Sequence, residues 1–578
     1  MRVTVLKEIP EDTDLCAAWN SLVFVMENPE IFFTYQWALA ASRGFRKNLY
    51  PLLFLIHDSG QLAGVAALAV DSRAPRAAFF LTSSTADYCD ILSAPENRRA
   101  VLLALLKEIQ NLGFRDLVLA SVPSTSVTLK EIPGVAGSNG FYITSRVAYD
   151  CGIVQLGDEQ QRKTLVQTVA GKSREKRALK KLAALGSVSV IHLTEPEQIK
   201  TSLEAIASAQ ISRFLVSGRV SPLVDSERRT FLTQLTDLLA QAGWLKISQL
   251  EVNGQPIAWN YGFRFEGSWF WYLPAFQIKY EHASPGSCLL RLLVEEGCKD
   301  PSLRWLDLGL GDESYKARFA NNARRTRYVQ LSRGFPKHVA KIGRNVLGAT
   351  VARFPYVENK LRRTMALYHA LASRIQRTGV VETSQHSIHR AMQTFASQGE
   401  VLLFESPKVE VSERASNRLL PLTWEHLVQA SISNADDTHT LGYLMRCARR
   451  LTQAGVSGFV LQDETSQSKH FLWIASYDGF HLSEIDHTLE PFSPCAAMIF
   501  DCWTPAAARA CGYYATAIRS AAASLQSEGK SAWIFSGAGN ASSLRGILNA
   551  GFEYRFSLVR RRRFGHSIII RHDTTTVI

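Results

Sequence analysis

The sequence predicts an α/β fold class in which several units each combine strands and helices. Strand-like and helix-like stretches alternate along most of the chain, glycines and other turn residues separate them, and no stretch is low in complexity. At 578 residues the chain is also longer than one hydrophobic core usually organises. We expect one unit over residues 1–145, a second over 146–334, a connector over 335–384 and a C-terminal unit over 385–578.

The first unit begins with paired strands. Residues 50–70, YPLLFLIHDSGQLAGVAALAV, predict two strands that turn at Asp58-Ser59-Gly60. Residues 98–113 have a helical pattern that ends at a glycine, and the apolar stretch DLVLASV over 116–122 predicts a buried strand. This alternation makes the unit α/β.

The second unit begins near Cys151 with a basic helix. Residues 172–193 predict this helix, stopped by Gly186, and a strand after it. Residues 244–276 alternate like three strands, with turns at Asn253-Gly254 and Glu266-Gly267. The other expected elements are helices over 202–215, 227–243 and 283–297 and a strand over 303–310.

Residues 283–297, ASPGSCLLRLLVEEG, have the features of a capped helix start. Ser284 is a typical capping residue, Pro285 suits the first helical position, and Gly286 leaves the backbone uncovered. Free amides at such a start also attract anions. Helix capping alone explains these residues, but next to the aromatic stretch 268–276 this helix start is the strongest candidate anion site in the chain.

The C-terminal unit repeats the alternation from about Glu400. Residues 471–486 predict a hairpin that turns at Asp478-Gly479. The other expected elements are strands over 495–503, 531–537 and 552–565 and helices over 508–529 and 541–552.

The connector carries most of the net charge. The formal charge of the chain is +13, and the segment from Arg324 to Arg377 holds thirteen Lys or Arg against the single acid Glu358. Apolar residues between 339 and 354 recur at helical spacing, which predicts an amphipathic helix. A connector that packs on its neighbours explains this pattern, and so does a surface for anionic lipid headgroups, an acidic carrier protein or nucleic acid.

The cysteines and the N-terminus indicate the compartment. The nine cysteines form no CxxC pair and have no histidines at metal-ligand spacing, so we expect free thiols and no metal site. The N-terminal segment is charged where a signal peptide is apolar, and no run of about 18 apolar residues offers a membrane span. We expect a cytoplasmic protein, with peripheral contact at the inner membrane through residues 335–377 as a further expectation.

The C-terminal unit resembles the GNAT acyltransferase fold. That family holds the pyrophosphate of coenzyme A at a Gln/Arg-x-x-Gly-x-Gly/Ala helix start, which Arg509, Gly512 and Tyr514 match here, with a bulky tyrosine at the small-residue position. The family often has a catalytic tyrosine seven residues after an asparagine like Asn540, where this chain has Ile547. These departures predict that the unit is degenerate, unless Tyr554, just beyond Gly551-Phe552, substitutes.

Residues 1–334 resemble the CelD/FemAB-like branch of the same superfamily, in which two GNAT-like halves form one acyltransferase. Two positions depart from the pattern, Gln277 in place of an aspartate and Leu310 in place of an arginine. The matching stretches are FFTYQW (32–37), ADYCDIL (86–92), the basic helix 172–181, VNGQPIAWNYGF (252–263), YLPAFQIKYEHASPGSCLL (272–290) and LDLGLGDESYKARF (306–319). The resemblance implies two GNAT-like halves in tandem, followed by the third GNAT-like domain.

The resemblance implies an acyl-thioester donor, either acyl-CoA or an acyl carrier protein, and no metal. The phosphates of the donor would lie at helix starts. The candidate donor-binding residues are Ser284, Gly286, Ser287, Arg509, Gly512 and Asn540.

The candidate catalytic residues follow the strand that contains Asp307. This carboxyl falls in an apolar stretch, where burial raises a pKa into a useful range. Tyr315 and Lys316 follow it, together with Asp312 and Glu313. A structural salt bridge beside a core strand is the competing explanation.

The candidate substrate contacts lie on loops and among aromatic residues. Asp87 and Tyr88, with Asp90, fall between a strand and a helix, where polar residues often contact ligands and where turn and capping chemistry is the alternative. Tyr272 and Tyr280 are the other candidates, although aromatic packing in the sheet also explains Tyr272.

These observations predict an N-acyltransferase that moves an acyl group from the thioester to an amine. The acceptor is expected to be a small molecule or a sugar of bacterial exopolysaccharide or cell-envelope synthesis. Two alternatives are a non-catalytic scaffold of a polysaccharide-synthesis machine and an aminoacyl-tRNA-dependent FemAB-like transferase. General nucleic-acid binding is not expected, because the chain has no recognition motif and its basic excess is concentrated in the connector.

Overall fold

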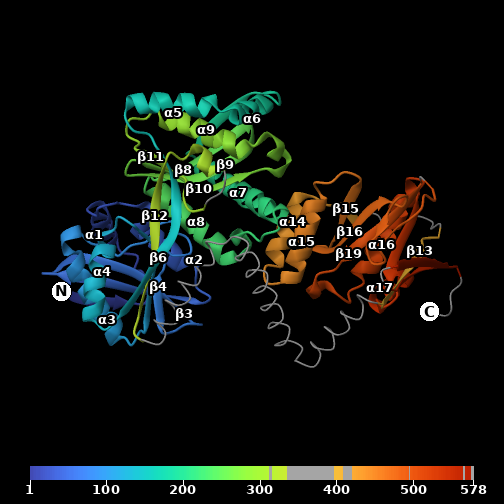
Figure 1. Cartoon of the computed structure of the whole chain (residues 1–578), viewed down its shortest axis with the longest axis horizontal. Helices are drawn as coiled ribbons and strands as arrows, with labels where there is room; N and C mark the ends of the chain where they lie inside the picture. Colours follow the sequence, from blue (N-terminus) through green and yellow to red (C-terminus); the bar gives the residue numbers. More distant parts are fainter. Residues whose placement is uncertain (312–314, 335–395, 408–418, 494, 564–565, 574–578) are drawn as a thin grey trace. The chain divides into compact units, whose positions relative to one another are not determined.

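The computed structural model describes residues 1–311, 315–334, 396–407, 419–493, 495–563 and 566–573. The predicted connector over 335–384 lies outside these residues. The chain divides into two compact units, unit 1 with Met1–Arg213 and Pro222–Thr350 and unit 2 with Phe214–Ser221 and Val351–Ile578 (Figure 1). Both units are α/β, as predicted. In the described part of the chain no helix has the length and apolar character needed to cross a membrane.

The first half of unit 1 follows the order strand, two helices, three strands, helix, strand, helix, strand. The turn between the second and third strands has positive φ at Ser59 and Gly60, as a two-residue hairpin requires. The elements are β1 (Arg2–Leu6), α1 (Thr13–Phe24), α2 (Tyr35–Gly44), β2 (Leu49–Asp58), β3 (Gln61–Asp71), β4 (Ala77–Phe80), α3 (Arg98–Asn111), β5 (Asp116–Pro123), α4 (Val127–Ser138) and β6 (Tyr142–Gln155).

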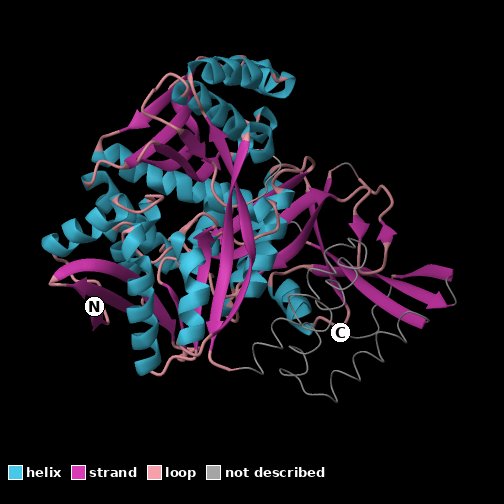
Figure 2. Ribbon diagram, turned by 60° about the vertical axis from the view of Figure 1, so that its left-hand side comes forward, coloured by secondary structure: helices cyan, strands magenta, loops and turns pink. Residues whose placement is uncertain are grey.

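The second half of unit 1 repeats this order after two additional helices, α5 (Glu159–Gly171) and α6 (Ser173–Ala183). The repeated elements are β7 (Val188–Leu193), α7 (Pro196–Val216), α8 (Ser226–Gln241), β8 (Leu245–Val252), β9 (Gln255–Phe265), β10 (Ser268–Phe276), α9 (Pro285–Gly297), β11 (Trp305–Asp307), α10 (Lys316–Phe319) and β12 (Asn322–Ser332). Helices flank the strands of this unit (Figure 2).

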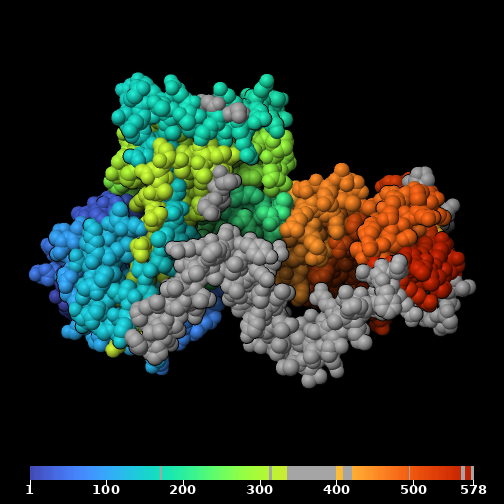
Figure 3. All heavy atoms as spheres, in the orientation of Figure 1, coloured from blue at the N-terminus to red at the C-terminus, as the bar shows by residue number. Residues whose placement is uncertain are grey.

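The two halves exchange their last strands. β5 of the first half pairs with β12 of the second half, β11 of the second half pairs with β6 of the first, and β6 and β12 pair with each other. One twelve-stranded sheet results, in the order β1-β2-β3-β4-β5-β12-β6-β11-β10-β9-β8-β7. The halves therefore form one continuous body, drawn in blue to yellow in Figure 3.

The exchanged strands are not predicted by the sequence patterns above. β6 shows no clear alternation, since most of its residues before Cys151 are exposed or half-buried. β12 begins with the arginine-rich stretch NARRTR, which resembles the start of a basic connector. Their strand character follows from pairing with each other along most of their length.

α9 is fixed by its apolar face. Cys288, Leu289, Leu293 and Val294 on this helix are buried in a core that also contains Leu306 of β11. Full burial of each leucine contributes about 1.5–3 kcal/mol. This packing holds the start of α9 beside the end of β10.

Unit 2 follows the same order from β14 to β21, apart from the small hairpin of β17 and β18, and β13 and β22 extend its sheet to eight strands. β13 lies between β20 and β21, so the sheet runs β14-β15-β16-β19-β20-β13-β21-β22. The elements are β13 (Ala396–Glu405), β14 (Leu419–Pro421), α14 (Trp424–Ser433), α15 (Thr438–Arg450), β15 (Val456–Gln462), β16 (Ser468–Ser476), β17 (His481–Leu482), β18 (His487–Thr488), β19 (Ala496–Trp503), α16 (Tyr513–Ser527), β20 (Ser531–Gly537), α17 (Ala541–Asn549), β21 (Glu553–Arg563) and β22 (His566–His572).

The predicted hairpin over 471–486 is wrong. β16 pairs with β15 and β19, whereas β17 pairs only with β18. Tyr477, Leu482 and Ile485 are buried in a core with strand residues of the sheet, so the segment after β16 folds over the sheet instead of extending it. We call residues 477–493 the insert.

Candidate functional site

The central feature of unit 1 is the place where β10 and β11 separate. These parallel strands pair only from Ser268 to Phe270, where Phe270 lies opposite Asp307. The pairing of β10 with β9 is also irregular between Phe270 and Leu273. The backbone of Trp271 and Tyr272 therefore has no ladder partner on β11, and such a gap is a suitable place for a ligand to reach strand amides.

α9 starts after the separated end of β10, but Ser284 does not cap it as predicted. Ser284 has φ 52° and ψ 51°, and its side chain makes no capping hydrogen bond. A capping hydroxyl reaches the first-turn amides from an extended backbone, which this left-handed conformation is not. The Ser284 carbonyl instead accepts from the amides of Ser287 and Cys288, at 3.1 and 3.2 Å.

The surroundings of the α9 start are open and basic. A Cβ added at Gly286 would meet only Phe276, at an ordinary 3.5 Å. The Arg318 guanidinium donates to Ser287 Oγ at 3.2 Å and also lies 3.5 Å from the buried carboxylate of Glu175. An arginine therefore stands at the helix start, although one acid partly neutralises it.

Asp307 is completely buried between the two halves. Its carboxylate accepts hydrogen bonds from the Tyr88 hydroxyl and from the Gly309 amide, both at 2.8 Å, and lies 3.5 Å from the Arg324 guanidinium. Burial raises the pKa of Asp307, while Arg324 and the hydrogen bonds act against this rise. The predicted burial of this carboxyl is confirmed.

Arg324 joins Asp307 to a second buried acid, Glu30. The guanidinium bonds the Glu30 carboxylate and lies 4.4 Å from the centre of the Tyr88 ring. Burial raises the pKa of Glu30 to about 7, although Arg324 opposes the shift. Burial also raises the pKa of Tyr88 well above its usual value. The phenol therefore stays protonated and donates to Asp307.

Asp87 completes a pair of carboxyl groups with Asp307. Burial and the charge of Asp307 raise the pKa of Asp87 to about 7, while Lys316 opposes the rise. Gly309 has φ 70°, and a Cβ there would lie 2.6 Å from Asp87 Oδ2. Because Gly309 has no side chain, the Asp87 carboxylate can lie close to its backbone, while the Asp307 carboxylate accepts from its amide.

Lys316 lies close enough to this carboxyl pair to act on both groups, and Tyr315 precedes it in the chain. The Trp271 indole donates to the Tyr315 hydroxyl at 3.1 Å, which places that phenol next to the separated part of β10. The Lys316 ammonium is buried and donates to the Leu310 carbonyl. Asp312 and Glu313 lie outside the described residues.

The other candidate substrate residues do not all join this cluster. Tyr272 donates to the Thr85 carbonyl at 2.6 Å, and its ring packs against Trp37, so it closes the contact between the halves. Tyr280 lies under the Lys279 ammonium and packs on the core near α9. Asp90 bonds Thr128 and lies 3.6 Å from Arg98, in a separate buried network.

The start of α16 corresponds in unit 2 to the start of α9, and side chains of unit 2 itself occupy the space beside it. Tyr514 bonds Ser543 at 3.1 Å, and a Cβ at Gly546 would lie 2.3 Å from its ring. Arg509 donates to the Thr504 carbonyl, and Asn540 caps α17 by accepting from the Ser543 amide. The structure therefore places Tyr514 between α16 and α17.

Two further predicted features of unit 2 have structural functions. Ile547 is fully buried in the core. Tyr554 donates to the His572 carbonyl at 3.1 Å and packs against Phe404, so its hydroxyl is engaged by the edge strand β22. Gly512 precedes α16 with φ 79°, a conformation that favours glycine.

The sequence patterns miss Glu30 and Arg324. Glu30 is a single acid before the buried run IFF, and an acid in such an apolar context is an available signal. Arg324 is counted above among the connector charges, yet it lies in β12 and is largely buried. Only the strand exchange, which patterns do not reveal, brings it to Asp307.

The described side chains were also compared with the ligand sets of metal ions. Among them, no group of three or more His, Cys, Asp or Glu could hold a metal ion. All nine cysteines are free thiols, and Cys495 and Cys511 are exposed. The cluster offers three carboxyl groups of raised pKa, Glu30, Asp87 and Asp307, and the last lies beside strand amides.

Comparisons with known proteins identify the class of this region. Residues 171–317 match the family model described as an acetyltransferase (GNAT) domain, a range that contains β10, α9 and β11. This part of the chain is a GNAT-type domain, and the predicted GNAT-like α/β fold is confirmed. No curated protein matches the chain.

The chain is similar to several solved structures at low identity. The C-terminal domain of a putative lysylphosphatidylglycerol synthetase from Agrobacterium fabrum is 11% identical, covering 58% of this chain and 96% of that chain with a TM-score of 0.38. FemX is 10% identical, with 59% and 99% covered and a TM-score of 0.41. A tandem GNAT protein from the clavulanic acid biosynthesis pathway is 11% identical, with 57% and 98% covered and a TM-score of 0.34.

Proposed function

We propose that unit 1 is an N-acyltransferase that moves an acyl group from a thioester to an amine. The observation that supports this most is the buried contact between Tyr88 of the first half and Asp307, which lies in the GNAT-type domain beside the separated end of β10. The donor is proposed to be acyl-CoA or an acyl carrier protein, with its phosphates at the α9 start near Ser284, Gly286 and Ser287.

In the proposed reaction the amine nitrogen attacks the thioester carbonyl, the C–N bond forms and the C–S bond breaks. Amides of the separated β10 backbone are suited to stabilise the oxyanion. The proton that leaves the amine passes to the Asp87–Asp307 pair, because the charge of Asp307 helps to raise the pKa of Asp87 to about 7. The thiolate leaves as the thiol after it takes up a proton, for which Tyr315 is the proposed donor.

Lys316 and Tyr88 act as positioning residues in this proposal. The Lys316 ammonium fixes the Leu310 carbonyl after β11, and Tyr88 orients the Asp307 carboxylate. Tyr272 and Tyr280 are proposed to border the acceptor. The acceptor itself is proposed to be an amine on a small molecule or sugar of exopolysaccharide or cell-envelope synthesis, which rests on the CelD/FemAB-like resemblance alone.

A thiol-release assay tests the activity. The full chain would be incubated with a panel of acyl-CoA donors and amine acceptors, and free thiol would be followed with time. Asp307→Asn should reduce kcat/KM by about 10²-fold or more, because it removes a group that handles the proton. Absence of thiol release with every combination, together with no acyl-CoA binding by calorimetry, would contradict the proposal.

A second function is proposed for unit 2, which we infer to be a binding module and not a transferase. Tyr514 supports this, because it occupies the space between α16 and α17 where a donor pyrophosphate would approach. If so, Arg509→Gln should leave the activity of the full chain unchanged. The predicted lipid or carrier contact through 335–377 concerns residues outside the described ranges and stays a prediction.

A further inference from the structure

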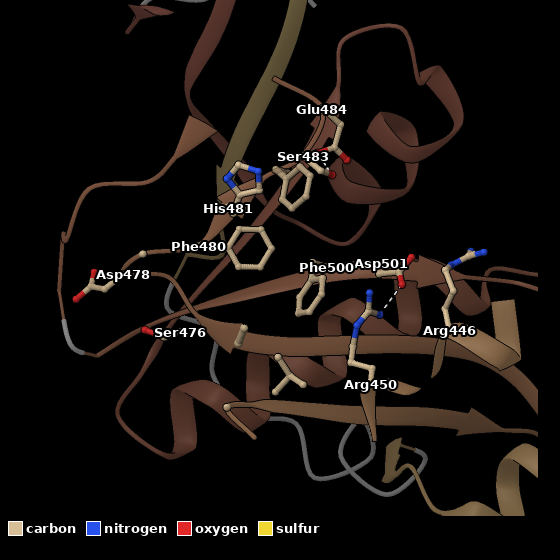
Figure 4. A pocket seen from close by; sticks show the side chains of 15 residues that line it. Arg446, Arg450, Ser476, Asp478, Phe480, His481, Ser483, Glu484, Phe500 and Asp501 are labelled. Carbon is tan, nitrogen blue, oxygen red and sulfur yellow. Dashed lines mark hydrogen bonds and ion pairs between the residues drawn. The ribbon is translucent and has the colours of Figure 1, made fainter. Parts of the chain in front are cut away.

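Unit 2 contains a cavity that none of the proposed transfer chemistry uses. Its volume is about 590 Å³, which is in the range of small-molecule sites (Figure 4). The insert, α15 and the strands β19 and β20 surround it. The cavity lies where β19 separates from β20, since Ile499 and Ile534 are the last paired residues and Phe500 and Phe535 come next.

Three phenylalanine rings give the cavity an apolar wall. Phe480 of the insert lies with its ring centre 5.0 Å from that of Phe500 and 5.8 Å from that of Phe535. All three are only partly buried, so part of each ring faces the cavity. The insert that carries Phe480 is anchored by buried Leu482 and Ile485, and the wall is therefore preformed.

An internal ion pair fixes another part of the wall. The Arg450 guanidinium bonds Asp501 at 2.5 Å and lies 5.1 Å from the centre of the Phe500 ring. The Asp501 backbone is held in a left-handed conformation, φ 45°, and its carbonyl accepts from the Tyr443 hydroxyl at 2.8 Å. These two charges neutralise each other, so they leave no net charge for a ligand.

Arg446 and Glu484, two opposite charges at the border of the cavity, are not paired in this way, while the Asp478 carboxylate accepts from the amides of Phe492 and Ser493. Arg446 and Glu484 both line it and are exposed, and neither makes an ion pair with any residue in the described ranges. The Arg446 guanidinium has only a 3.4 Å contact with the Gly442 carbonyl and the Tyr443 ring beside it. Glu484 accepts from the neighbouring Ser483 hydroxyl at 3.2 Å.

We propose that this cavity binds a small zwitterion with an apolar body, of the chemical class of the apolar and aromatic α-amino acids. The ligand carboxylate would bond Arg446, its ammonium would bond Glu484, and its side chain would cover the phenylalanine rings. A ligand with a single charge would use only one of the two border charges, whereas a zwitterion pairs with both.

Calorimetry on the full chain tests this assignment with L-phenylalanine and L-leucine as probes. Arg446→Gln should weaken L-phenylalanine binding at least tenfold but leave L-phenylalaninamide, which has no carboxylate, unaffected. Glu484→Gln should weaken L-phenylalanine binding similarly but leave N-acetyl-L-phenylalanine, which has no ammonium, unaffected. A tenfold change corresponds to about 1.4 kcal/mol.

Matched controls come from the same unit. Glu490→Gln and Arg545→Gln remove exposed charges that do not line the cavity, and both should leave binding unchanged. Thermal unfolding would verify that each variant is folded. No heat from either amino acid at concentrations on the order of 10 mM, or binding that neither cavity variant changes, would overturn the proposal.

Discussion

The Tyr88 hydroxyl donates a hydrogen bond to Asp307 across the junction of the two halves, over 2.8 Å and with both side chains fully buried. The phenol comes from the loop after β4, and the carboxylate comes from the end of β11. Because neither group is open to water, the contact serves both the stability of the junction and the orientation of the carboxylate.

Replacing Tyr88 by phenylalanine should show both effects. The change leaves one lone pair of a buried carboxylate without its donor, which should lower the free energy of unfolding by about 1–3 kcal/mol. Urea unfolding measures this loss, and thiol release measures activity. Tyr50→Phe, at an exposed position in unit 1, is the matched control and should change neither quantity.

The Glu30–Arg324 pair gives a prediction about stability. Arg324→Met leaves Glu30 as a buried acid without its counter-charge, and removal of one partner of a buried pair costs about 3–5 kcal/mol. The double variant Glu30→Gln with Arg324→Met should lose less than the sum of the two single variants. Strictly additive losses in a double-mutant cycle would show that the pair is not coupled.

The raised pKa of Asp87 predicts a pH dependence of activity. A carboxyl that receives a proton must be ionised, so kcat/KM should rise through about pH 7 and level off above it. Activity is therefore present above this pKa and is lost as the pH falls below it. Asp87→Asn should remove this loss of activity at low pH. A kcat/KM that stays constant from pH 6 to 8, about one unit either side of the pKa, would show that Asp87 does not receive the proton.

Gly309 should tolerate no side chain. Gly309→Ala combines a left-handed backbone, which costs roughly 1–2 kcal/mol, with a clash between the new methyl group and the Asp87 carboxylate. Gly60→Ala has a similar φ, 87°, and nothing within 4 Å, so it measures the backbone cost alone. The difference between the two losses in unfolding free energy isolates the clash. Equal losses would mean that Asp87 moves away freely.

An acid at the α9 start should reveal whether the donor binds there. Ser287→Asp places a negative charge at the proposed phosphate position, and KM for acyl-CoA should rise at least tenfold with little change in stability. Ser226→Asp adds the same charge at the exposed start of α8 and should leave KM unchanged. An unchanged KM for Ser287→Asp would show that the donor phosphates bind elsewhere.

The helices and most strands could be predicted because their signals are local. α9 shows an apolar face with a proline at its start, and the turn after Asp58 contains Gly60, a residue that favours positive φ. The burial of Asp307 followed from its apolar neighbours in the same way. Signals of this kind are contained within about a dozen residues.

The candidate site could be predicted only in part because its contacts are distant in sequence. Asp307 was found, but its partners Tyr88 and Arg324 reach it through the exchange of β6 and β12, and no local pattern encodes that exchange. The conformation of Ser284 was also missed, because a serine before a proline does not indicate a left-handed backbone.

The exchanged strands also affect how the protein is made on the ribosome. Val118 pairs with Gln330, so β5 has no partner on that side until residues beyond 330 have been synthesised. At about 5–20 residues per second, the nascent first half would wait roughly ten to forty seconds with one strand edge open. During translation this edge is available to chaperones and to neighbouring nascent chains, and a fragment that ends before β12 would keep it open permanently.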